Sequence, residues 1–463
     1  MAISNGHSNE DSNDHSIHKI VGGKTNWHFD TLQVHAGLED SPAYGQTTLP
    51  IYNSGSFKFK SAADADDAFT VAGSEKYIYS RIGNPTEAGF EKRMAALEDG
   101  TDALAFTSGA AAVMAVIMSL ARAGDNVIVS IFTHAGTYHQ FGVILPQLGI
   151  EARFCDTNDL DRVEQLIDGK TKFIFTESIG NPKFSIADLE QLAATAHRVK
   201  IPLLVDATFT AGGYFCQPGK WGADIVIHSS SKWIGGHGTT LGGVVIETGR
   251  SDWQTNAERF PQLHGMRPGR EGIESNLHKT VGNRAYIGFL RMEILRDTGA
   301  CISPYAAQQM FIGVETLSLR CERQAKNTAM LAHWLRAHPR INWVRYLGFE
   351  DHPYHQLAVK YLQRGFGTVL SFGMQSAEGL RVVDAFKLIS NTTNVGDCKT
   401  VVGHHWSTSH RSCTKEENER MGVFEDLFRL SLGIEAVEDI IADFEQAFER
   451  VPALSLIPGA LAS

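Results

Sequence analysis

The sequence predicts an α/β protein, in which a mostly parallel central sheet is covered by helices on both faces and followed by a smaller α+β domain. From about residue 80 to residue 247, short β-branched runs alternate with amphipathic segments of helix length. The runs are apolar throughout, which is typical of strands buried on both faces. A second block begins near Cys301 with a long helical pattern. These observations favour one large domain with a smaller companion.

The first block contains seven predicted strands, at residues 103–106, 126–131, 151–154, 172–176, 202–206, 224–228 and 243–247. Helical patterns lie between several of them, over residues 87–98, 110–122, 160–167 and 186–198. In the second block we expect one long helix over residues 306–337, strands over 343–347 and 368–372, and a closing helix over 437–450. Ligands of such sheets bind at the carboxyl ends of the strands, so the loops there are the first candidates for a binding site.

Charge and cysteine usage exclude several classes of protein. The 463 residues carry 42 Lys and Arg against 52 Asp and Glu, a formal net charge of −10, whereas sequence-independent nucleic-acid binding needs concentrated positive charge. The six cysteines are scattered without Cys-x-x-Cys spacing, so neither a zinc site nor a disulfide framework is predicted. The polar N-terminus lacks the apolar core of a secretory signal, and no apolar stretch is long enough for a membrane span. We expect a cytoplasmic protein without a metal, nucleic-acid or membrane partner.

Two loops at strand ends are candidate ligand sites. The turn TSGAA at residues 107–111 leads into a helix, whose free backbone N–H groups suit a phosphate. Many strand-to-helix turns have this composition without binding anything, so the turn alone is a weak indication. Asp206 ends the apolar strand of residues 201–205. A carboxylate there is either a cap or turn residue or the partner of a ligand cation.

A third loop, HSSSKWIGGHG at residues 228–238, places Lys232 directly after a strand, with Ser229 and Ser231 before it and glycines after it. The hydroxyls can donate to a phosphate while the lysine forms an imine with an aldehyde cofactor, since a partly desolvated lysine loses its proton readily. A solvated surface lysine would explain Lys232 alone but not the other two loops. Together the three loops predict a pyridoxal phosphate (PLP) site, with an imine lysine, a carboxylate for the pyridinium nitrogen and a phosphate cup.

The segments YSRIGNPT (79–86), VDATF (205–209) and SSSKWIGGH (229–237) resemble the Cys/Met-metabolism class of PLP enzymes. Within it, the chain is similar to O-acetylhomoserine sulfhydrylases over roughly residues 28–452, with further support from residues 295–300, 313–317, 394–397 and 428–435. The resemblance implies a type I aminotransferase-like PLP fold. We expect a disordered tail (1–27), an N-terminal arm (28–78), a PLP-binding domain (79–300) and a C-terminal domain (301–463).

The resemblance also implies roles for individual residues. Lys232 would hold the cofactor covalently and move protons, and Asp206 would pair with the pyridinium nitrogen. The phosphate would be bound by four residues of this chain, the backbone N–H groups of Gly109 and Ala110 and the side chains of Ser229 and Ser231. Tyr79 and Arg81 would reach the phosphate from the neighbouring subunit, and Tyr79 would also be a catalytic residue, together with Lys232. The resemblance therefore implies an obligate homodimer, which is usually paired into a homotetramer. The substrate carboxylate would be held by Arg429, Asn181 and Thr400. For Arg429, an internal ion pair with Glu435 or another acid is the alternative.

Departures from the family pattern bear on the substrate. A tyrosine that stacks on the cofactor ring is replaced by His134, the asparagine after the strand-end aspartate by Ala207, and the serine of an Asp-Ala-Lys-Ser motif by Thr400. The stretch usually written HPASTTH places Trp406 near the substrate mouth here. These changes resemble fungal specialised-metabolism relatives that join O-acetylhomoserine to carbon or nitrogen nucleophiles.

The resemblance therefore implies γ-substitution on O-acetyl-L-homoserine through a vinylglycine ketimine, with a second small molecule as nucleophile. We expect a carbon nucleophile, such as the enolate of a β-keto acid or ester. Sulfide or a thiol ranks second and an amine third. A γ-lyase that releases 2-oxobutanoate is a rival within the same cofactor class. A non-catalytic scaffold is a rival outside it, against which the intact lysine, aspartate and phosphate turn argue.

Overall fold

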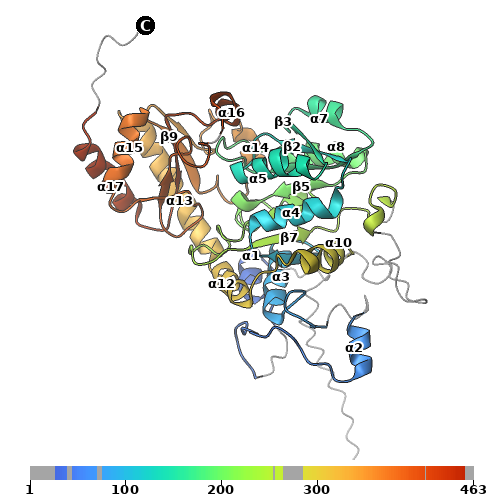
Figure 1. Ribbon diagram of the computed structural model, residues 1–463. Helices are drawn as coiled ribbons and strands as arrows, with labels where there is room; N and C mark the ends of the chain where they lie inside the picture. The colour runs from blue at the N-terminus through green and yellow to red at the C-terminus, as the bar shows by residue number, and fades with distance from the viewer. Residues whose placement is uncertain are drawn as a thin grey trace, which may run out of the picture.

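The computed structural model describes residues 27–38, 44–69, 76–253, 256–263, 285–411 and 413–453. These residues form a seven-stranded central sheet and a five-stranded C-terminal sheet, with helices against each (Figure 1). The predicted tail of residues 1–27 lies outside the described residues except for Trp27. The predicted arm of residues 28–78 is described apart from residues 39–43 and 70–75.

The central sheet has the strand order β1-β7-β6-β5-β4-β2-β3. Only β7 runs antiparallel to its neighbours, so the prediction of a mostly parallel sheet is confirmed. The strands predicted at residues 202–206 and 224–228 each begin one residue later than expected, and at the first of them Pro202 has no N–H to donate to the ladder. The strands are β1 (Asp102–Phe106), β2 (Asn126–Ser130), β3 (Glu151–Cys155), β4 (Thr171–Glu177), β5 (Leu203–Asp206), β6 (Ile225–His228) and β7 (Gly243–Glu247).

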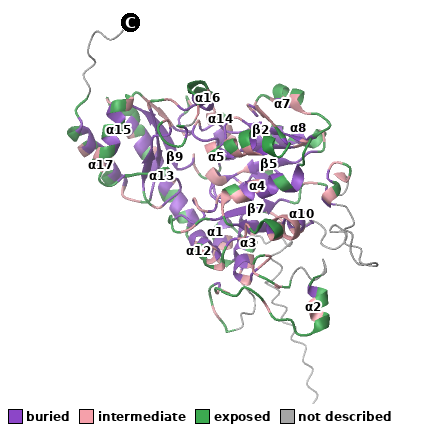
Figure 2. Cartoon of the chain, viewed as in Figure 1, coloured by how far each residue is buried: buried purple, intermediate pink, exposed green. Residues whose placement is uncertain are grey.

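Helices cover both faces of the central sheet, as the apolar strands require. Successive side chains of a strand point to opposite faces, so Leu104 and Phe106 of β1 pack with α4 (Gly109–Leu120) while Ala103 and Ala105 pack on the other side. That other side holds α3 (Pro85–Leu97) and α8 (Leu189–Arg198). Figure 2 shows the buried strands between the two helical layers.

Local signals set the starts of these helices. Asn84 caps α3 by accepting the N–H of Thr86, and Pro85 occupies the first helical position, where its missing N–H costs nothing. Helix α8 starts three residues later than predicted because Asp188 serves as its N-cap. The other α-helices described before residue 300 are α1 (Phe29–His35), α2 (Ala62–Ala68), α5 (Ala135–His139), α6 (Leu145–Gln147), α7 (Leu160–Leu166), α10 (Ala285–Phe289) and α11 (Arg296–Thr298).

The C-terminal sheet has the order β10-β11-β12-β9-β8 and is antiparallel except between β10 and β11. Its strands are β8 (Trp343–Arg345), β9 (Val369–Gly373), β10 (Ser390–Asn391), β11 (Val401–Gly403) and β12 (Leu427–Ser431). Helices α15 (Ser376–Ala385) and α17 (Val437–Arg450) pack against it and share one apolar core with its strands. The remaining helices here are α14 (His355–Tyr361) and α16 (Lys415–Met421).

The prediction of one long helix over residues 306–337 is wrong. The segment is two helices, α12 (Pro304–Glu315) and α13 (Leu317–Ala337), separated at Thr316, where φ is −115° and ψ is 15°. The break serves packing, because α12 lies against α3 while α13 lies against α17 and the C-terminal sheet. No helix within the described parts of the chain is both long and apolar enough to cross a bilayer.

Candidate active site

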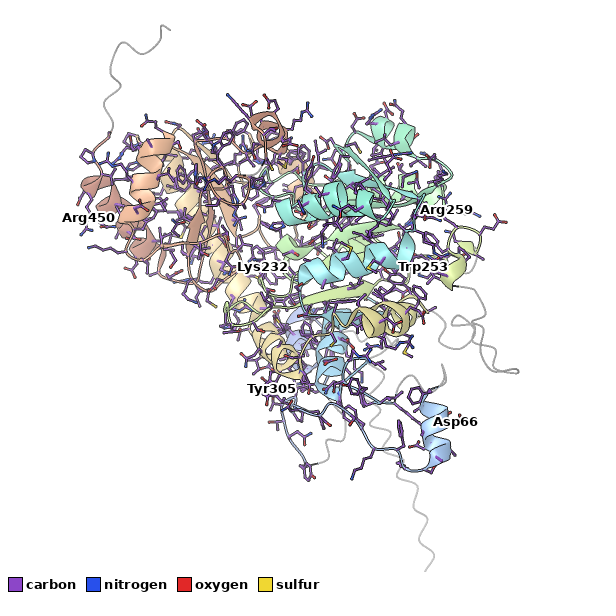
Figure 3. All side chains as sticks on the ribbon, viewed as in Figure 1. Asp66, Lys232, Trp253, Arg259, Tyr305 and Arg450 are labelled. Atoms are coloured by element: carbon purple, nitrogen blue, oxygen red, sulfur yellow. The ribbon has the colours of Figure 1, made fainter. Side chains whose placement is uncertain are left out.

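A cavity of about 430 Å³ lies where the carboxyl ends of the central strands face the C-terminal sheet. Figure 3 places Lys232 there, between the two halves of the molecule. Nine of the predicted site residues line the cavity: Gly109, Ala110, His134, Asn181, Asp206, Ser229, Ser231, Lys232 and Arg429. The loops singled out in the sequence are therefore brought together by the fold.

The start of helix α4 forms one wall of the cavity. Ser108 caps the helix by accepting the N–H of Ala111, which leaves the N–H groups of Gly109 and Ala110 without an acceptor among the described residues. Helix α4 meets the loop after β6 so closely that a Cβ on Gly109 would lie 2.6 Å from the Cβ of Ser229. A glycine is therefore needed here, and the close approach makes an anion cup from two distant segments.

Ser231 also lines the cup, although its hydroxyl has a protein partner as well. It donates to the carbonyl of Gly242 at 3.2 Å and accepts the N–H of the same residue at 3.0 Å. Thr208, which was not predicted as a site residue, stabilises the cup through a hydrogen bond to Ser229. Its hydroxyl accepts the N–H of Ser229 at 2.8 Å, so it fixes the loop that carries the lysine.

Asp206 stands at the end of β5 with its carboxylate held in place by Thr208, whose N–H donates to Oδ1 at 2.9 Å. Burial raises the pKa of Asp206, and Thr208 partly opposes the rise. In the β4–β5 ladder, Asp206 pairs with Glu177 on β4. Glu177 is buried, and its pKa is raised well above the ordinary value, first by burial and then by the nearby charge of Asp206. Glu177 accepts the backbone N–H of His134 at 2.6 Å. This second carboxyl group was missed from sequence because nothing local marks it.

Lys232 is half-buried in the cavity wall, and its Nζ donates to Asn394 Oδ1 at 2.7 Å. Burial, together with the positive charge of Arg429, lowers the pKa of Lys232 to about 8. With this pKa, about one Lys232 side chain in ten is neutral at pH 7 and about half at pH 8, far more than for an ordinary lysine, and the neutral amine is the form that acts as a nucleophile.

Arg429, on β12, is buried and lacks a carboxylate partner among the described residues. Its guanidinium donates to Asn181 Oδ1 at 3.0 Å and to the carbonyls of Thr393 and Asn394 at 3.1 and 3.2 Å, while its Nε has no partner. Burial lowers its pKa to about 9. The alternative of an ion pair with Glu435 is excluded. An unpaired buried cation on a cavity wall suits an anionic ligand.

Thr400, predicted to hold the substrate carboxylate, does not line the cavity. Its hydroxyl donates to Glu435 Oε2 at 2.9 Å and accepts the N–H of Gly433, and its own N–H donates to Glu435 Oε1. Thr400 therefore braces the turn after β12. The site prediction for Thr400 has no support in this geometry, because all of its polar atoms are engaged away from the cavity, its carbonyl by the N–H of Ser390.

Tyr79 and Arg81 also lie outside this cavity. Tyr79 is 45% exposed, and the guanidinium of Arg81 lies 5.5 Å from the centroid of its ring and donates to the carbonyl of Arg296. Both residues are thus on the surface of their own subunit, and their assignment to a neighbouring subunit's site stays a prediction.

Histidines occupy the part of the cavity next to Arg429. His134 caps α5, its Nδ1 accepting the N–H of Gly136 at 3.1 Å, and burial, with the charges of Lys232 and Arg429, lowers its pKa to about 4. His405 and His410 line the same region, whereas Trp406, expected at the substrate mouth, does not line the cavity. This stretch therefore reaches the cavity through His405, Ser409 and His410 and not through Trp406. Sequence reasoning noted the altered stretch but not which side chain faces inward.

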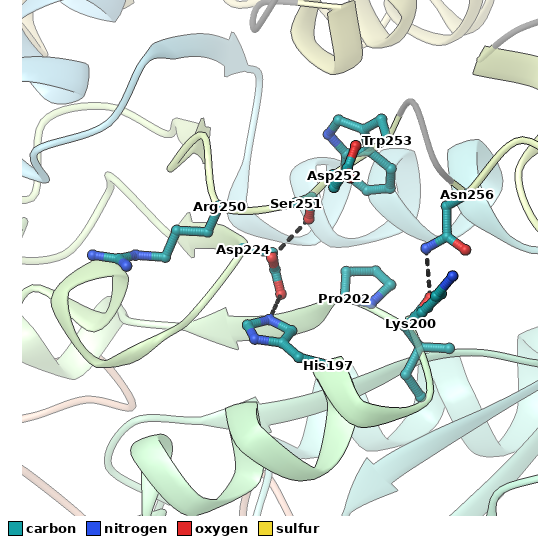
Figure 4. Close-up of a pocket in the computed structure, with 10 residues that line it drawn as sticks. His197, Lys200, Pro202, Asp224, Arg250, Ser251, Asp252, Trp253 and Asn256 are labelled. Atoms are coloured by element: carbon teal, nitrogen blue, oxygen red, sulfur yellow. Dashed lines mark hydrogen bonds and ion pairs between the residues drawn. The ribbon is translucent and has the colours of Figure 1, made fainter.

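A second cavity, of about 240 Å³, lies at the opposite end of the sheet (Figure 4). His197 and Ser251 both bond to the buried Asp224, at 2.8 and 2.7 Å, and the N–H of Leu203 donates to the same carboxylate. A nucleophilic triad needs the serine bonded to the histidine, and among the described residues this bond is missing. The described residues also hold no group of three or more His, Cys, Asp or Glu that could bind a metal.

The main cavity fits PLP on three observations. The free N–H groups of Gly109 and Ala110 lie beside Ser229 and form an anion cup, Lys232 is an amine with a depressed pKa, and Asp206 is a carboxylate whose raised pKa a pyridinium would offset. On a largely parallel seven-stranded sheet, these groups define a PLP-dependent enzyme of the type I fold class. Residues 30–449 match the family of Cys/Met metabolism PLP-dependent enzymes, and the chain belongs to that family.

Relatives and solved structures agree with this assignment. The chain is 46% identical to sulfhydrylase FUB7 of Fusarium oxysporum, over 91% of this chain and 97% of that protein. It is 47% identical to the homocysteine/cysteine synthase of Kluyveromyces lactis, over 92% and 98%. A crystal structure described as O-acetylhomoserine (thiol)-lyase from Campylobacter jejuni matches with a TM-score of 0.85 at 34% identity, covering 91% of this chain and 100% of that one. That protein carries a pyridoxyl-lysine phosphate.

Proposed function

We propose that the protein catalyses γ-substitution on O-acetyl-L-homoserine, with a carbon nucleophile as the second substrate. The observation that carries the γ-substitution is the placement of Arg429, a buried guanidinium without a carboxylate partner in the described chain, in the same cavity as Lys232. A small amino acid whose carboxylate binds Arg429 would present its α-carbon to Lys232. The names of the fungal relatives, a sulfhydrylase and a homocysteine/cysteine synthase, support this class of reaction.

Each residue has a task that follows from its surroundings. PLP, when bound, supplies an electron sink for carbanions formed at the substrate. Lys232 holds it and, with a pKa of about 8, takes and returns a proton at Nζ. Asp206, at the end of β5, would hold the pyridine nitrogen in its protonated form. Gly109 and Ala110 would bind the phosphate together with Ser229 and Ser231, while Arg429 and Asn181 orient the carboxylate of the amino acid.

The preference for a carbon nucleophile is supported by the histidines next to Arg429. His134, His405 and His410 all have depressed pKa values, so this end of the cavity is lined by neutral imidazoles. Neutral rings that both donate and accept suit the two oxygens of a β-keto acid or ester in its enol form, and they give no added positive charge for hydrosulfide. The sulfur reaction remains the alternative, favoured by the names of the relatives.

Product analysis tests this proposal. Purified protein is incubated with O-acetyl-L-homoserine and either sulfide or an acetoacetate ester, and the products are identified by mass spectrometry. We expect the carbon-linked adduct to form faster. Homocysteine forming far faster than any adduct would overturn the carbon preference, and 2-oxobutanoate released without a nucleophile would indicate a γ-lyase.

The same proposal includes a homodimer or homotetramer with shared sites. Tyr79 and Arg81 lie on the surface of the subunit and away from its own cavity, as residues that complete a partner's site would. We assign residues 79–300 to the PLP-binding domain and residues 301–463 to the C-terminal domain, which together form the cavity.

A further inference from the structure

Three side chains in the segment after β11 form a hydrogen-bonded chain on the cavity wall. His405 Nδ1 lies 2.6 Å from Ser409 Oγ, and the same oxygen lies 3.0 Å from His410 Nδ1. The two rings are perpendicular, with centroids 5.6 Å apart. All three residues line the cavity, yet His405 and His410 are only 3% and 2% exposed.

The outer nitrogen of each ring has no partner. His405 Nε2 and His410 Nε2 are both buried and without a hydrogen bond among the described residues. Buried polar atoms are almost always satisfied, so two unsatisfied nitrogens on one cavity wall indicate contact with a ligand. Strand pairing brings this segment beside Arg429, because Gly403, two residues before His405, is opposite Arg429 in the β11–β12 ladder.

The hydrogen-bond chain fixes how the two rings are protonated. Burial lowers the pKa of His410 to about 4 and that of His405 well below its ordinary value, so both rings are neutral and carry one N–H each. Ser409 has one proton, which it donates to one Nδ1 while accepting from the other. It follows that one Nε2 bears a proton and the other a lone pair.

We propose that His405, Ser409 and His410 form a proton relay that serves the β- and γ-carbons of the substrate, an inference that rests on the γ-substitution proposed above. In the first half-reaction, the basic Nε2 takes a proton from the β-carbon while the other Nε2 gives its proton to the departing acetate. The β C–H and γ C–O bonds break, and a β,γ double bond and the O–H bond of acetic acid form. Within the relay, one Nδ1 passes its proton to Ser409, and Ser409 passes its own to the other Nδ1.

The second half-reaction returns the relay to its starting state. The first has exchanged the tautomers of the two rings, so the Nε2 that protonated acetate now has a lone pair and takes the proton of the nucleophile. The other Nε2 gives its proton back to the β-carbon as the new bond forms at the γ-carbon. One proton enters and one leaves in each half, and neither ring becomes charged. That balance matters because burial disfavours an imidazolium here.

Hydrogen exchange in an unreactive substrate analogue tests the relay. The holoenzyme is incubated in D₂O with L-norvaline, which lacks a leaving group, and deuterium at the α- and β-carbons is followed by NMR. Ser409→Ala removes the link between the rings, so we expect β-exchange to fall about 100-fold while α-exchange, the work of Lys232, is unchanged. Ser409→Thr, which keeps the hydroxyl, should restore β-exchange.

Ser407→Ala is the matched control. Ser407 Oγ lies 2.8 Å from His404 Nδ1, the same kind of contact in the same segment, but neither residue lines the cavity. Equal loss in both alanine variants, unchanged β-exchange in Ser409→Ala, or a parallel fall of α-exchange would overturn the relay. If Ser409→Ala does not fold, His405→Phe is read by the same criteria. The assay needs no nucleophile, so its result is independent of which nucleophile the enzyme accepts.

Discussion

Lys232 Nζ donates a hydrogen bond of 2.7 Å to Asn394 Oδ1, and this contact joins the central sheet to the segment that precedes β11. The lysine is the residue that must react with an aldehyde, and the asparagine belongs to the part of the chain that also binds Arg429 through its backbone. The reactive amine is thus carried by a loop of the central sheet and oriented by the segment that precedes β11.

The pH dependence of cofactor capture should report the charge of Arg429. Capture requires the neutral amine, so the rate at which the apoprotein binds PLP should rise with pH, with a midpoint near the Lys232 pKa of about 8. Arg429→Gln removes a nearby positive charge that disfavours the ammonium form, so the midpoint should move to higher pH. The change is followed by the absorbance of the imine. Arg250→Gln, at the second cavity, should leave the midpoint in place.

The two adjacent carboxyl groups should respond differently to amidation. Asp206→Asn removes the charge that holds the pyridine nitrogen protonated, so we expect kcat to fall about 100-fold or more while PLP is still bound. Glu177→Gln keeps the Oε1 that accepts the His134 N–H and should cost far less. Steady-state rates and absorbance spectra of both variants distinguish them. Equal losses would contradict the separate roles.

The buried pair of Glu98 and His228 should matter for stability. His228 Nε2 lies 2.6 Å from Glu98 Oε1, and the pair ties the end of α3 to the last residue of β6, directly before the lysine loop. Glu98→Ala leaves the histidine buried without its partner, so the free energy of unfolding should fall by about 3 kcal/mol or more. Urea denaturation measures it. Glu164→Ala, in the exposed ion pair with Arg198, should cost about 1 kcal/mol or less.

Gly236, four residues after Lys232, should not tolerate a side chain. Its φ is +70°, and a Cβ there would meet the guanidinium of Arg320, which donates to the carbonyls of Trp233 and Gly313. Gly236→Ala should therefore lower both stability and activity. Gly299→Ala has nearly the same φ but open space around its Cβ, so it isolates the backbone strain of about 1–2 kcal/mol. A similar loss in both variants would show that the contact with Arg320 is unimportant.

Shared active sites can be tested by subunit exchange. Arg81→Ala and Lys232→Ala proteins should each be inactive, but a mixed dimer contains one site in which both residues are present. Random mixing should then restore about a quarter of the wild-type activity. The assay is the transfer reaction after subunit exchange in mild denaturant. If no activity returns although exchange is shown by mass-tagged subunits, the sites are not shared.

The central sheet and the cofactor loops could be predicted because their signals are local. Each strand is an apolar run, and the loop with Lys232 has its chemistry in consecutive residues. The break at Thr316 could not be predicted, since helical periodicity continues across it and only packing against α3 and α17 imposes it. Similarly, Thr400 lies beside a family motif, but the carboxylate of Glu435 turns its side chain away from the cavity.

Glu177 and His405 show the same limit within the site. Glu177 acquires its position from the register of β4 with β5, and His405 from the turn that follows β11. Neither position depends on a sequence motif, so neither the residue type nor its spacing predicted that Glu177 and His405 belong to the site. The residues expected to bind the cofactor could be predicted from the sequence. The side chains at the substrate end of the site could be assigned only once the pairing of the strands was known.

The bond between Arg429 and Asn181 spans 248 residues. A chain made from its N-terminus finishes the central sheet long before β12 exists, and until residue 394 is made the lysine loop lacks both Asn394 and the charge of Arg429. A fragment that ends before residue 394 should therefore have a lysine that reacts more slowly with free aldehydes than the lysine of the folded chain.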